Sequence, residues 1–201
     1  GLGQLVAVPV VLEGLHQRAQ GMRVDDDVDR PIGPQDQQAR WGAPLAEYPD
    51  DAWNKVLALN VKSVFHLTRA LVPQLKAAAT DADPARVINI GSVDGLHVPL
   101  LETYAYSASK AAVHHLTRTL ARRLAGENVT VNAIAPGPFE SKMMKKTLED
   151  FGDAIVASVP RGRIGQPGDC DGAAVYFLSD AARFVTGQVL AVDGGWSVSE
   201  G

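Results

Sequence analysis

A tyrosine and a lysine stand four residues apart in the segment Tyr106-Ser-Ala-Ser-Lys110. On a helix this spacing places both side chains on one face. An ammonium group close to a phenol stabilises the phenolate, so we expect Lys110 to lower the pKa of Tyr106 from about 10 toward neutrality. A phenol tuned in this way can give a proton to a carbonyl oxygen or take one from an alcohol. The pair therefore predicts acid–base chemistry on such a group, with a surface pair on a helix as the alternative.

A serine hydroxyl is expected close to this pair. Ser92 follows Arg86-Val-Ile-Asn-Ile-Gly91, a short β-branched run that predicts a buried strand. A hydroxyl at the carboxyl end of such a strand can hydrogen-bond a reacting carbonyl oxygen as charge develops on it. Taken alone, Ser92 is better explained as a turn residue after a strand, so its significance comes from Tyr106 and Lys110.

Four further residues are candidates for the same region. Asn60 lies inside a predicted helix, where asparagine is poorly suited. It could hold a water or bond to nearby backbone, although a satisfied buried amide is the better explanation from the residues alone. Pro136-Gly137 ends a strand, where glycine lets a backbone approach a ligand, and Ser141 could hydrogen-bond an amide group of that ligand. An ordinary strand-ending turn explains these three residues equally well.

The elements that must position these residues alternate after residue 40. Apolar residues at helical spacing from Trp53 to Leu75 predict a helix that starts near Ala52, behind Asp50-Asp51, which can cap it. The other elements are a strand at 86–91, a helix at 103–125, a strand at 129–135, a polar stretch at 141–159, a helix opened by residues 166–169 and ending at 178, and a strand at 189–192. Apolar strands alternating with helices indicate an α/β fold, with a parallel sheet covered on both faces. Ligands of such folds sit beyond the carboxyl ends of the strands.

Composition argues against several other classes of protein. The 201 residues, of which 46% are hydrophobic and 21% charged, fit one domain with a sizeable core. The formal charge of −4 argues against nucleic acid or an anionic membrane as the main partner. The single cysteine, Cys170, cannot form an internal disulfide, no histidine or cysteine spacing suits a metal, and no apolar run is long enough to span a bilayer. We therefore expect a cytoplasmic protein without a metal centre.

Taken together, the motifs resemble the short-chain dehydrogenase/reductase (SDR) family. The resemblance covers about Trp41 to Trp196, and it lies in the order and spacing of Asn60, Ile-Gly-Ser92, Tyr106-Ser-Ala-Ser-Lys110, Val-Asn-Ala-Ile-Ala-Pro136-Gly137 and Val-Asp193-Gly-Gly195. Each motif is weak, but their joint occurrence is specific. Within the family, Ile-Gly-Ser-Val-Asp-Gly and Gly-Glu-Asn-Val-Thr-Val-Asn-Ala-Ile-Ala-Pro-Gly look most like 3-oxoacyl-[acyl-carrier-protein] reductases, including the rhamnolipid-associated branch.

The resemblance implies a Rossmann-type, doubly wound sheet and an oxidoreductase that uses NADP or NAD. Such an enzyme would reduce a ketone or 3-oxoacyl group, or oxidise the matching alcohol, by hydride transfer. Its substrate would be a small carbonyl compound or alcohol, acyl thioesters included, and the chain would assemble as a homodimer or homotetramer. Residues 141–159 would form a mobile substrate lid.

The resemblance also implies a role for each matching residue. Tyr106 would be the catalytic acid–base, and Lys110 would bind the nicotinamide ribose and lower the pKa of Tyr106. Ser92 would orient the substrate carbonyl, and Asn60 would hold a water that relays protons through Lys110. The nicotinamide end of the cofactor would contact Pro136, Gly137 and Ser141, although the family commonly has threonine in place of this last residue.

Residues 1–40 do not match the family pattern. Leu5–Leu12 could be a strand, but residues 21–40 are polar and lack a period, so we expect an irregular segment before a catalytic part at 41–201. The family begins with a Thr-Gly-x-x-x-Gly-x-Gly loop that receives the cofactor pyrophosphate, and this sequence has no complete copy of it. We therefore expect a sheet that is incomplete at its amino-terminal end, and a frameshift, a mis-joined exon or a truncated gene model is the hypothesis that explains it.

Two functions remain open at this point. The intact set of Ser92, Tyr106 and Lys110 favours an enzyme. The incomplete glycine loop favours a catalytically impaired remnant that acts only through the oligomer contacts of the family, and a fragment that does not fold would follow from the same incompleteness.

Overall fold

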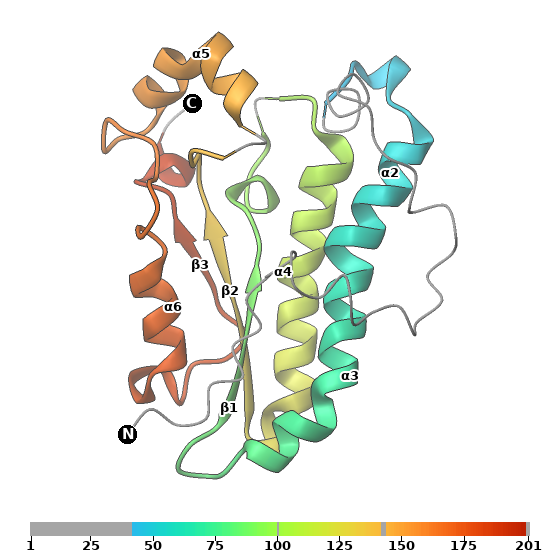
Figure 1. The fold of residues 1–201 in the computed structure, drawn as a ribbon, viewed down its shortest axis with the longest axis vertical. Coiled ribbons are helices and arrows are strands. Elements are labelled where there is room, and N and C mark those ends of the chain that lie inside the picture. Colours follow the sequence, from blue (N-terminus) through green and yellow to red (C-terminus); the bar gives the residue numbers. More distant parts are fainter. Residues whose placement is uncertain (1–41, 100, 142–143, 200–201) are drawn as a thin grey trace.

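In the part of the chain that the structure describes, the central element is a three-stranded parallel sheet (Figure 1). The computed structural model describes residues 42–99, 101–141 and 144–199, and the segment at 1–40, with its possible strand at 5–12, lies outside them. In the sheet, the strands follow their order in the chain: β1 (Ala85–Ile90), β2 (Val129–Pro136) and β3 (Val189–Val192). The parallel sheet is confirmed, and the strands predicted at 86–91, 129–135 and 189–192 are correct to within one residue at each end.

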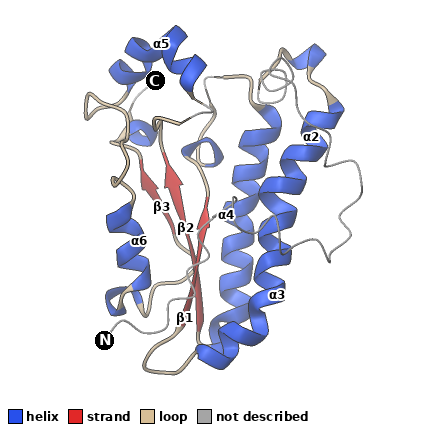
Figure 2. Ribbon diagram, viewed as in Figure 1, coloured by secondary structure: helices blue, strands red, loops and turns tan. Residues whose placement is uncertain are grey.

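Helices cover both faces of the sheet, as predicted (Figure 2). Two long helices lie against one face and a short one lies against the other: α3 (Ser63–Ala78) and α4 (Tyr104–Leu124) on the first, α6 (Asp171–Leu178) on the second. A further helix, α5 (Lys145–Ser158), stands beyond the carboxyl ends of the strands. The helices predicted at 103–125 and up to 178 are thus confirmed.

The alternation of side chains along β2 divides the core into two parts. Val129 and Val131 face α3 and α4, where they belong to the same apolar cluster as Leu75. Ile134 points to the opposite face and packs with Phe177 of α6. Because successive side chains of a strand point to opposite faces, a strand that is covered on both sides must be apolar throughout. This explains why β2 is a nearly continuous run of buried residues.

Two buried asparagines in the sheet have hydrogen-bond partners. The Asn132 amide donates to the carbonyl of Val185 at 2.8 Å and its oxygen accepts from the N–H of Gln188 at 3.0 Å, which ties β2 to the segment before β3. The Asn89 amide donates to the Thr117 hydroxyl at 2.9 Å, which ties β1 to α4. Buried polar groups are tolerated when they are paired in this way.

The helix predicted from Ala52 to Leu75 is divided by a π-helical turn. α2 (Asp50–Leu57) is followed by five residues of π-helix, Ala58–Lys62, and α3 then continues to Ala78. The prediction that Asp50-Asp51 caps the helix is wrong, because Pro49 occupies the N-cap position and both aspartates lie in the first turn. Their carboxylates still stabilise the helix there by interacting with the positive end of its dipole. Single π-helical turns often occur at functional sites, and this one contains Asn60.

The polar stretch at 141–159 contains a helix that the sequence analysis did not predict. α5 occupies most of it, from Lys145 to Ser158. Thr147, Phe151 and Ile155 recur at intervals of four residues, so they share one face of the helix. This face borders the cavity described below and does not pack into either part of the core.

Cys170 occupies the N-cap position of α6, and it is partly buried and without a disulfide. Within the described ranges, no helix is long and apolar enough to cross a membrane. Over the same ranges, no group of three or more histidine, cysteine, aspartate or glutamate side chains is placed to hold a metal ion.

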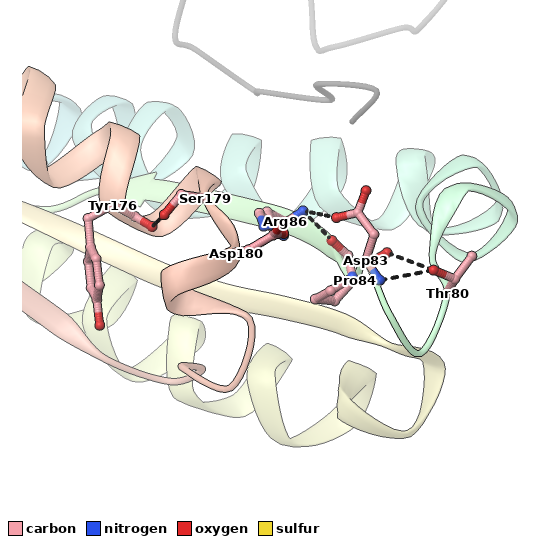
Figure 3. A network of polar contacts seen from close by, with 7 residues as sticks. All are labelled: Thr80, Asp83, Pro84, Arg86, Tyr176, Ser179 and Asp180. Atoms are coloured by element: carbon pink, nitrogen blue, oxygen red, sulfur yellow. Dashed lines mark hydrogen bonds and ion pairs between the residues drawn. The ribbon is translucent and has the colours of Figure 1, made fainter. Parts of the chain in front are cut away.

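Arg86 at the start of β1 fastens the strand to the segments on either side of it. Figure 3 shows its guanidinium group between the carboxylates of Asp83 and Asp180. The ion-pair distances are 2.5 Å to Asp83 and 3.1 Å to Asp180. The guanidinium also donates a hydrogen bond of 2.8 Å to the carbonyl of Pro84. The arginine side chain is only 12% exposed, whereas the Asp83 and Asp180 side chains are 47% and 79% exposed. Asp180 follows α6, so this network joins β1 to the helix layer on the second face.

Replacing Arg86 with methionine is expected to lower the free energy of unfolding by about 1–2 kcal/mol. Methionine keeps much of the buried aliphatic part of the side chain but removes its charged hydrogen bonds. These contribute less to stability than fully buried ones, because both carboxylates are exposed to solvent. Urea denaturation monitored by circular dichroism measures the loss.

The matched control is Lys55→Met, because the 3.8 Å ion pair of Lys55 with Asp51 lies on the surface. We expect that variant to stay within about 0.5 kcal/mol of the wild type. Equal effects of the two substitutions would show that the Arg86 network does not fasten the sheet.

Candidate active site

A cavity of about 440 Å³ lies beyond the carboxyl ends of β1 and β2. Side chains of α4 and α5 form its walls together with the loops that follow the two strands. Of the seven residues predicted for the site, six line this cavity: Ser92, Tyr106, Lys110, Pro136, Gly137 and Ser141. The expectation that a site would form at this edge of a parallel sheet therefore agrees with the structure.

Ser92 and Tyr106 meet at one end of the cavity. Ser92 follows β1 after a single glycine and is 8% exposed, and its hydroxyl accepts a 3.2 Å hydrogen bond from the N–H of Asp94. Tyr106 lies in the first turn of α4 and is partly buried. The two side chains are joined by a hydrogen bond. A substrate carbonyl placed here would meet two hydroxyl groups from different elements.

The pKa of Tyr106 is shifted in the direction opposite to the prediction. Burial raises this pKa above its usual value near 10, the hydrogen bond with Ser92 partly opposes the rise, and the negative charge of Asp94 adds to it. The sequence analysis expected Lys110 to lower the pKa, but it could not include the desolvation of the phenol, which disfavours the charged form. In this structure Tyr106 is therefore a neutral proton donor at neutral pH.

Lys110 reaches the same end of the cavity from the next turn of α4. Its ammonium group donates to the carbonyl of Ile90 at 3.2 Å and lies 5.4 Å from the centre of the Tyr106 ring, within the range of a cation–π contact. Burial lowers the pKa of Lys110, and the nearby Asp94 carboxylate partly opposes that shift. The Tyr–Lys spacing thus places both groups on one helix face, as predicted.

Asn60 does not line the cavity, but it is connected to the site through α4. Its amide donates to the Ser109 hydroxyl at 2.9 Å, and that hydroxyl donates to the Tyr106 carbonyl at 2.7 Å. This contact matches the simpler explanation of Asn60 as a satisfied amide. The water relay through Lys110 stays a prediction.

The residues after β2 are held by local contacts. A Cβ atom on Gly137 would lie 2.6 Å from the Cβ of Asp193, so the close approach of the two chain segments requires glycine there irrespective of any ligand. The Ser141 hydroxyl accepts a 3.1 Å hydrogen bond from the N–H of Met144, in the turn that leads into α5. Both residues remain at the surface of the cavity.

The sequence analysis missed several residues that shape the cavity. Most are apolar and come from the turns around it and from α5: Pro99, Leu101, Phe139, Met144, Phe151, Ile155 and Trp196. Asp94 also lines it, and burial raises the pKa of this carboxyl while the charges of His97 and Lys110 oppose the rise. The position of Asp94 two residues after Ser92 was the only signal for it, whereas the apolar face of α5 could have been found from its four-residue spacing.

Comparison with known proteins places this geometry in a family. Residues 32–197 match the family model described as enoyl-(acyl carrier protein) reductase. The chain belongs to the short-chain dehydrogenase/reductase family. The resemblance first drawn from the motifs around Ser92, Tyr106 and Lys110 is thereby confirmed.

Curated SDR relatives include enzymes named for different substrates. A rhamnolipids biosynthesis 3-oxoacyl-[acyl-carrier-protein] reductase of Pseudomonas aeruginosa is 45% identical over 158 residues, which are 78% of this chain and 62% of the relative. A 2-dehydro-3-deoxy-D-gluconate 5-dehydrogenase of Pseudoalteromonas atlantica is 39% identical over 77% of this chain and 59% of the relative. The chain thus spans about three fifths of the length of these relatives.

Solved SDR structures confirm the Rossmann-type fold. The Pseudomonas aeruginosa RhlG/NADP active-site complex superposes with a TM-score of 0.74 at 45% identity, over 78% of this chain and 62% of that one. A gluconate 5-dehydrogenase from Burkholderia cenocepacia, in complex with NADP and tartrate, has the same TM-score of 0.74 at 31% identity, over 79% and 61% of the two chains.

The described residues suit the nicotinamide end of an NADP-type cofactor. Ile90 and Gly91 border the cavity with Pro136 and Gly137, and the two glycines lack a side chain that would keep a flat ring from the backbone. The ammonium group of Lys110 is available in the same cavity as a donor to ribose hydroxyls. The part of the chain that the structure describes holds no glycine-rich loop of the family type, so this fit concerns the nicotinamide ribose alone.

Proposed function

We propose that this protein is an NADP(H)-dependent carbonyl reductase that acts on 3-oxoacyl thioesters or similarly apolar ketones. The observation that carries the proposal is the meeting of Ser92, Tyr106 and Lys110 at one end of a single cavity. A hydroxyl, a neutral phenol and an ammonium group are the set needed to protonate a carbonyl oxygen during its reduction. The NADP in the titles of solved relatives supports the choice of cofactor.

The chemistry divides between the carbonyl carbon and its oxygen. NADPH, when bound, supplies the hydride that adds to the carbon. Ser92 donates a hydrogen bond to the oxygen and fixes its position, and Tyr106 transfers its phenolic proton to the oxygen as negative charge develops there. Lys110 holds the ribose, and its ammonium group lies 5.4 Å from the centre of the Tyr106 ring. The product is an alcohol, and Tyr106 recovers its proton from solvent.

The wall of the cavity favours an apolar substrate over a sugar acid. Phe139, Met144, Phe151 and Ile155 contribute apolar surface to the cavity that Ser92 and Tyr106 also line. Among the described residues that line the cavity, Lys110 is the one cation, and the proposed mechanism commits it to the ribose. A carboxylate substrate such as gluconate would need a positive partner in this space, whereas an acyl chain needs only apolar contact.

The experiment that tests the proposal uses the 201-residue chain and two classes of substrate. NADPH and then NADH are titrated while nicotinamide fluorescence is followed, and oxidation of NADPH is then measured with 3-oxoacyl thioesters of increasing chain length and with keto-sugar acids. We expect NADPH to bind more tightly than NADH, and kcat/KM to rise with acyl chain length. A folded chain that binds neither cofactor would contradict the proposal and favour a remnant that acts through protein contacts.

The pH dependence should follow from the raised pKa of Tyr106. A phenol whose pKa is raised stays protonated through neutral pH and loses its proton only in the alkaline range. We therefore expect kcat/KM for reduction to be level across neutral pH and to fall as the pH rises through the pKa of Tyr106, while alcohol oxidation rises over the same interval. Initial rates in both directions between neutral and strongly alkaline pH measure this.

Ser92→Ala provides the matching control for the pH profile. The hydrogen bond of the Ser92 hydroxyl lowers the pKa of Tyr106. Without it, kcat/KM should be lower, and the alkaline fall of kcat/KM should move to higher pH. If kcat/KM of the wild type already fell below neutral pH, the pKa of the Tyr106 phenol would not be raised.

We also propose that the chain associates with itself through α2, the π-helical turn and α3. Leu59 and Phe65 are 47% and 40% exposed there, and Trp53 and Leu67 on the adjoining helices are 39% and 37% exposed, so several large apolar side chains reach the surface of these elements. Light scattering during size-exclusion chromatography tests the association, and Phe65→Glu should shift the distribution toward the monomer.

A further inference from the structure

His114 lies directly behind the site, and the proposed mechanism gives it no function. It follows Lys110 by four residues and Tyr106 by eight on α4, so the three side chains share one helix face. His114 is 1% exposed, and it is not among the residues that border the cavity. A buried imidazole in this position can act only through the residues that it touches.

The imidazole packs against the turn that carries Ser92. The N–H of Ser92 donates to the Nε2 atom of His114 at 3.4 Å, a long hydrogen bond. A Cβ atom on Gly91 would lie 2.0 Å from Nε2, and one on Gly95 would lie 2.9 Å from the Cε1 atom of the ring. Glycine on both sides of Ser92 therefore leaves the space that the ring fills, and the ring sets where the backbone of Ser92 can lie.

His114 is held in its neutral form. Burial lowers its pKa, the backbone of Gly95 partly opposes this shift, and the positive charges of Arg118 and Lys110 lower the pKa further. A neutral ring has one unprotonated nitrogen that can accept a hydrogen bond. Because Nε2 accepts a hydrogen bond from the N–H of Ser92, the ring proton belongs on Nδ1.

On the basis of the proposed reductase function, we propose that His114 is a positioning residue for Ser92. Its ring fixes the backbone of Ser92, so that the serine hydroxyl meets the phenol of Tyr106 in the geometry that orients a carbonyl. His114 touches neither substrate nor cofactor in this arrangement. Its loss should weaken the Ser92–Tyr106 hydrogen bond while all three mechanistic side chains remain present.

The first test measures the phenol itself and needs neither substrate nor cofactor. The four tyrosines are labelled with ¹³C at Cζ and titrated by NMR, and Tyr106→Phe assigns the Tyr106 signal. Ser92→Ala should move the Tyr106 titration to higher pH, because the Ser92 hydrogen bond lowers that pKa. His114→Met should shift it in the same direction, and His114→Gln, which restores an acceptor, should return it toward the wild type.

The control for this titration is His115→Met, because His115 is the exposed neighbour on the same helix and should leave the phenol unchanged. A ¹⁵N spectrum of the unsubstituted protein adds a readout that does not depend on the folding of any variant, and it should show His114 neutral with Nε2 unprotonated. A Tyr106 titration that Ser92→Ala moves and His114→Met leaves in place, or a protonated Nε2, would overturn the proposal.

Kinetics separate this proposal from the proposed function. His114→Met should reduce kcat by up to about a hundredfold, the scale expected for a displaced catalytic group, with the KM for NADPH unchanged, and His114→Gln should recover part of the rate. If His114 served stability alone, His114→Met would lower the melting temperature without moving the Tyr106 titration, and His114→Gln would not recover kcat. That result would overturn the proposal. If the phenol responds as expected in a chain that reduces no ketone, the reductase function fails and the positioning of Ser92 by His114 stands.

Discussion

Replacing Tyr106 with phenylalanine is expected to lower the rate of ketone reduction by about 10²–10⁴-fold, the usual contribution of a positioned general acid. The variant loses the only phenolic proton at the site, since Tyr106 is the one tyrosine among the described residues that border the cavity. Its stability should change by about 1 kcal/mol or less, because the Ser92 hydroxyl keeps its contact with the N–H of Asp94. Steady-state rates and a thermal melt of the same preparation measure both quantities.

The chain offers a matched control for this substitution two residues earlier. Tyr104 begins the same helix, but its hydroxyl donates to the Glu102 carboxylate at 2.8 Å, outside the cavity. Tyr104→Phe removes the same atom from the same helix turn and should keep the rate within about twofold, as for a surface change. Full activity in Tyr106→Phe would contradict the assignment of the proton donor.

Replacing Gly91 with alanine is expected to cost more stability than the other substitutions considered above. The new Cβ atom would lie 2.0 Å from the Nε2 atom of His114. The backbone of Gly91 cannot move away easily, because its N–H donates a hydrogen bond of 2.7 Å to the Ile134 carbonyl. Overpacking of this kind costs about 1–3 kcal/mol and sometimes more. For a protein of this size we expect a fall in melting temperature on the order of 5–10 °C, together with a loss of activity because Ser92 is the next residue.

A double substitution tests the cause of this instability. All three nearest contacts of the Gly91 Cβ position are atoms of the His114 ring, so His114→Ala should restore much of the stability of Gly91→Ala. Gly95→Ala is the control, because its Cβ would lie 2.6 Å from the backbone of Ala111 and Lys110, which His114→Ala leaves in place. Equal rescue of both glycine variants would show that the ring is not the obstacle at Gly91.

The strands could be predicted closely because their signals are local. β2 is a buried run bounded by Asn128 and Pro136-Gly137, and β3 ends at Asp193-Gly-Gly195, where two glycines have positive φ angles of 68° and 91°. Asparagine, aspartate, glycine and proline residues at both ends of an apolar run restrict where a strand can begin and end. The site at the carboxyl ends of the strands then follows from the parallel arrangement alone.

The features that could not be predicted depend on the surroundings of a residue. The π-helical turn at Asn60 adds a residue to one turn without breaking the apolar pattern from Trp53 to Leu75, so one continuous helix was expected. The pKa of Tyr106 depends on its burial, whereas the spacing to Lys110 only places the two groups together.

The order of the strands has a consequence for how the site matures during synthesis. β1 pairs with β2 through Ala85 and Val129, but β3 joins β2 only at Val189, close to the carboxyl end of the chain. Domains form as the chain leaves the ribosome from its amino end. Ser92, Tyr106 and Lys110 therefore emerge before Trp196, which lines the same cavity. Because Trp196 follows β3, we expect the cavity to be complete only after β3 has paired with β2.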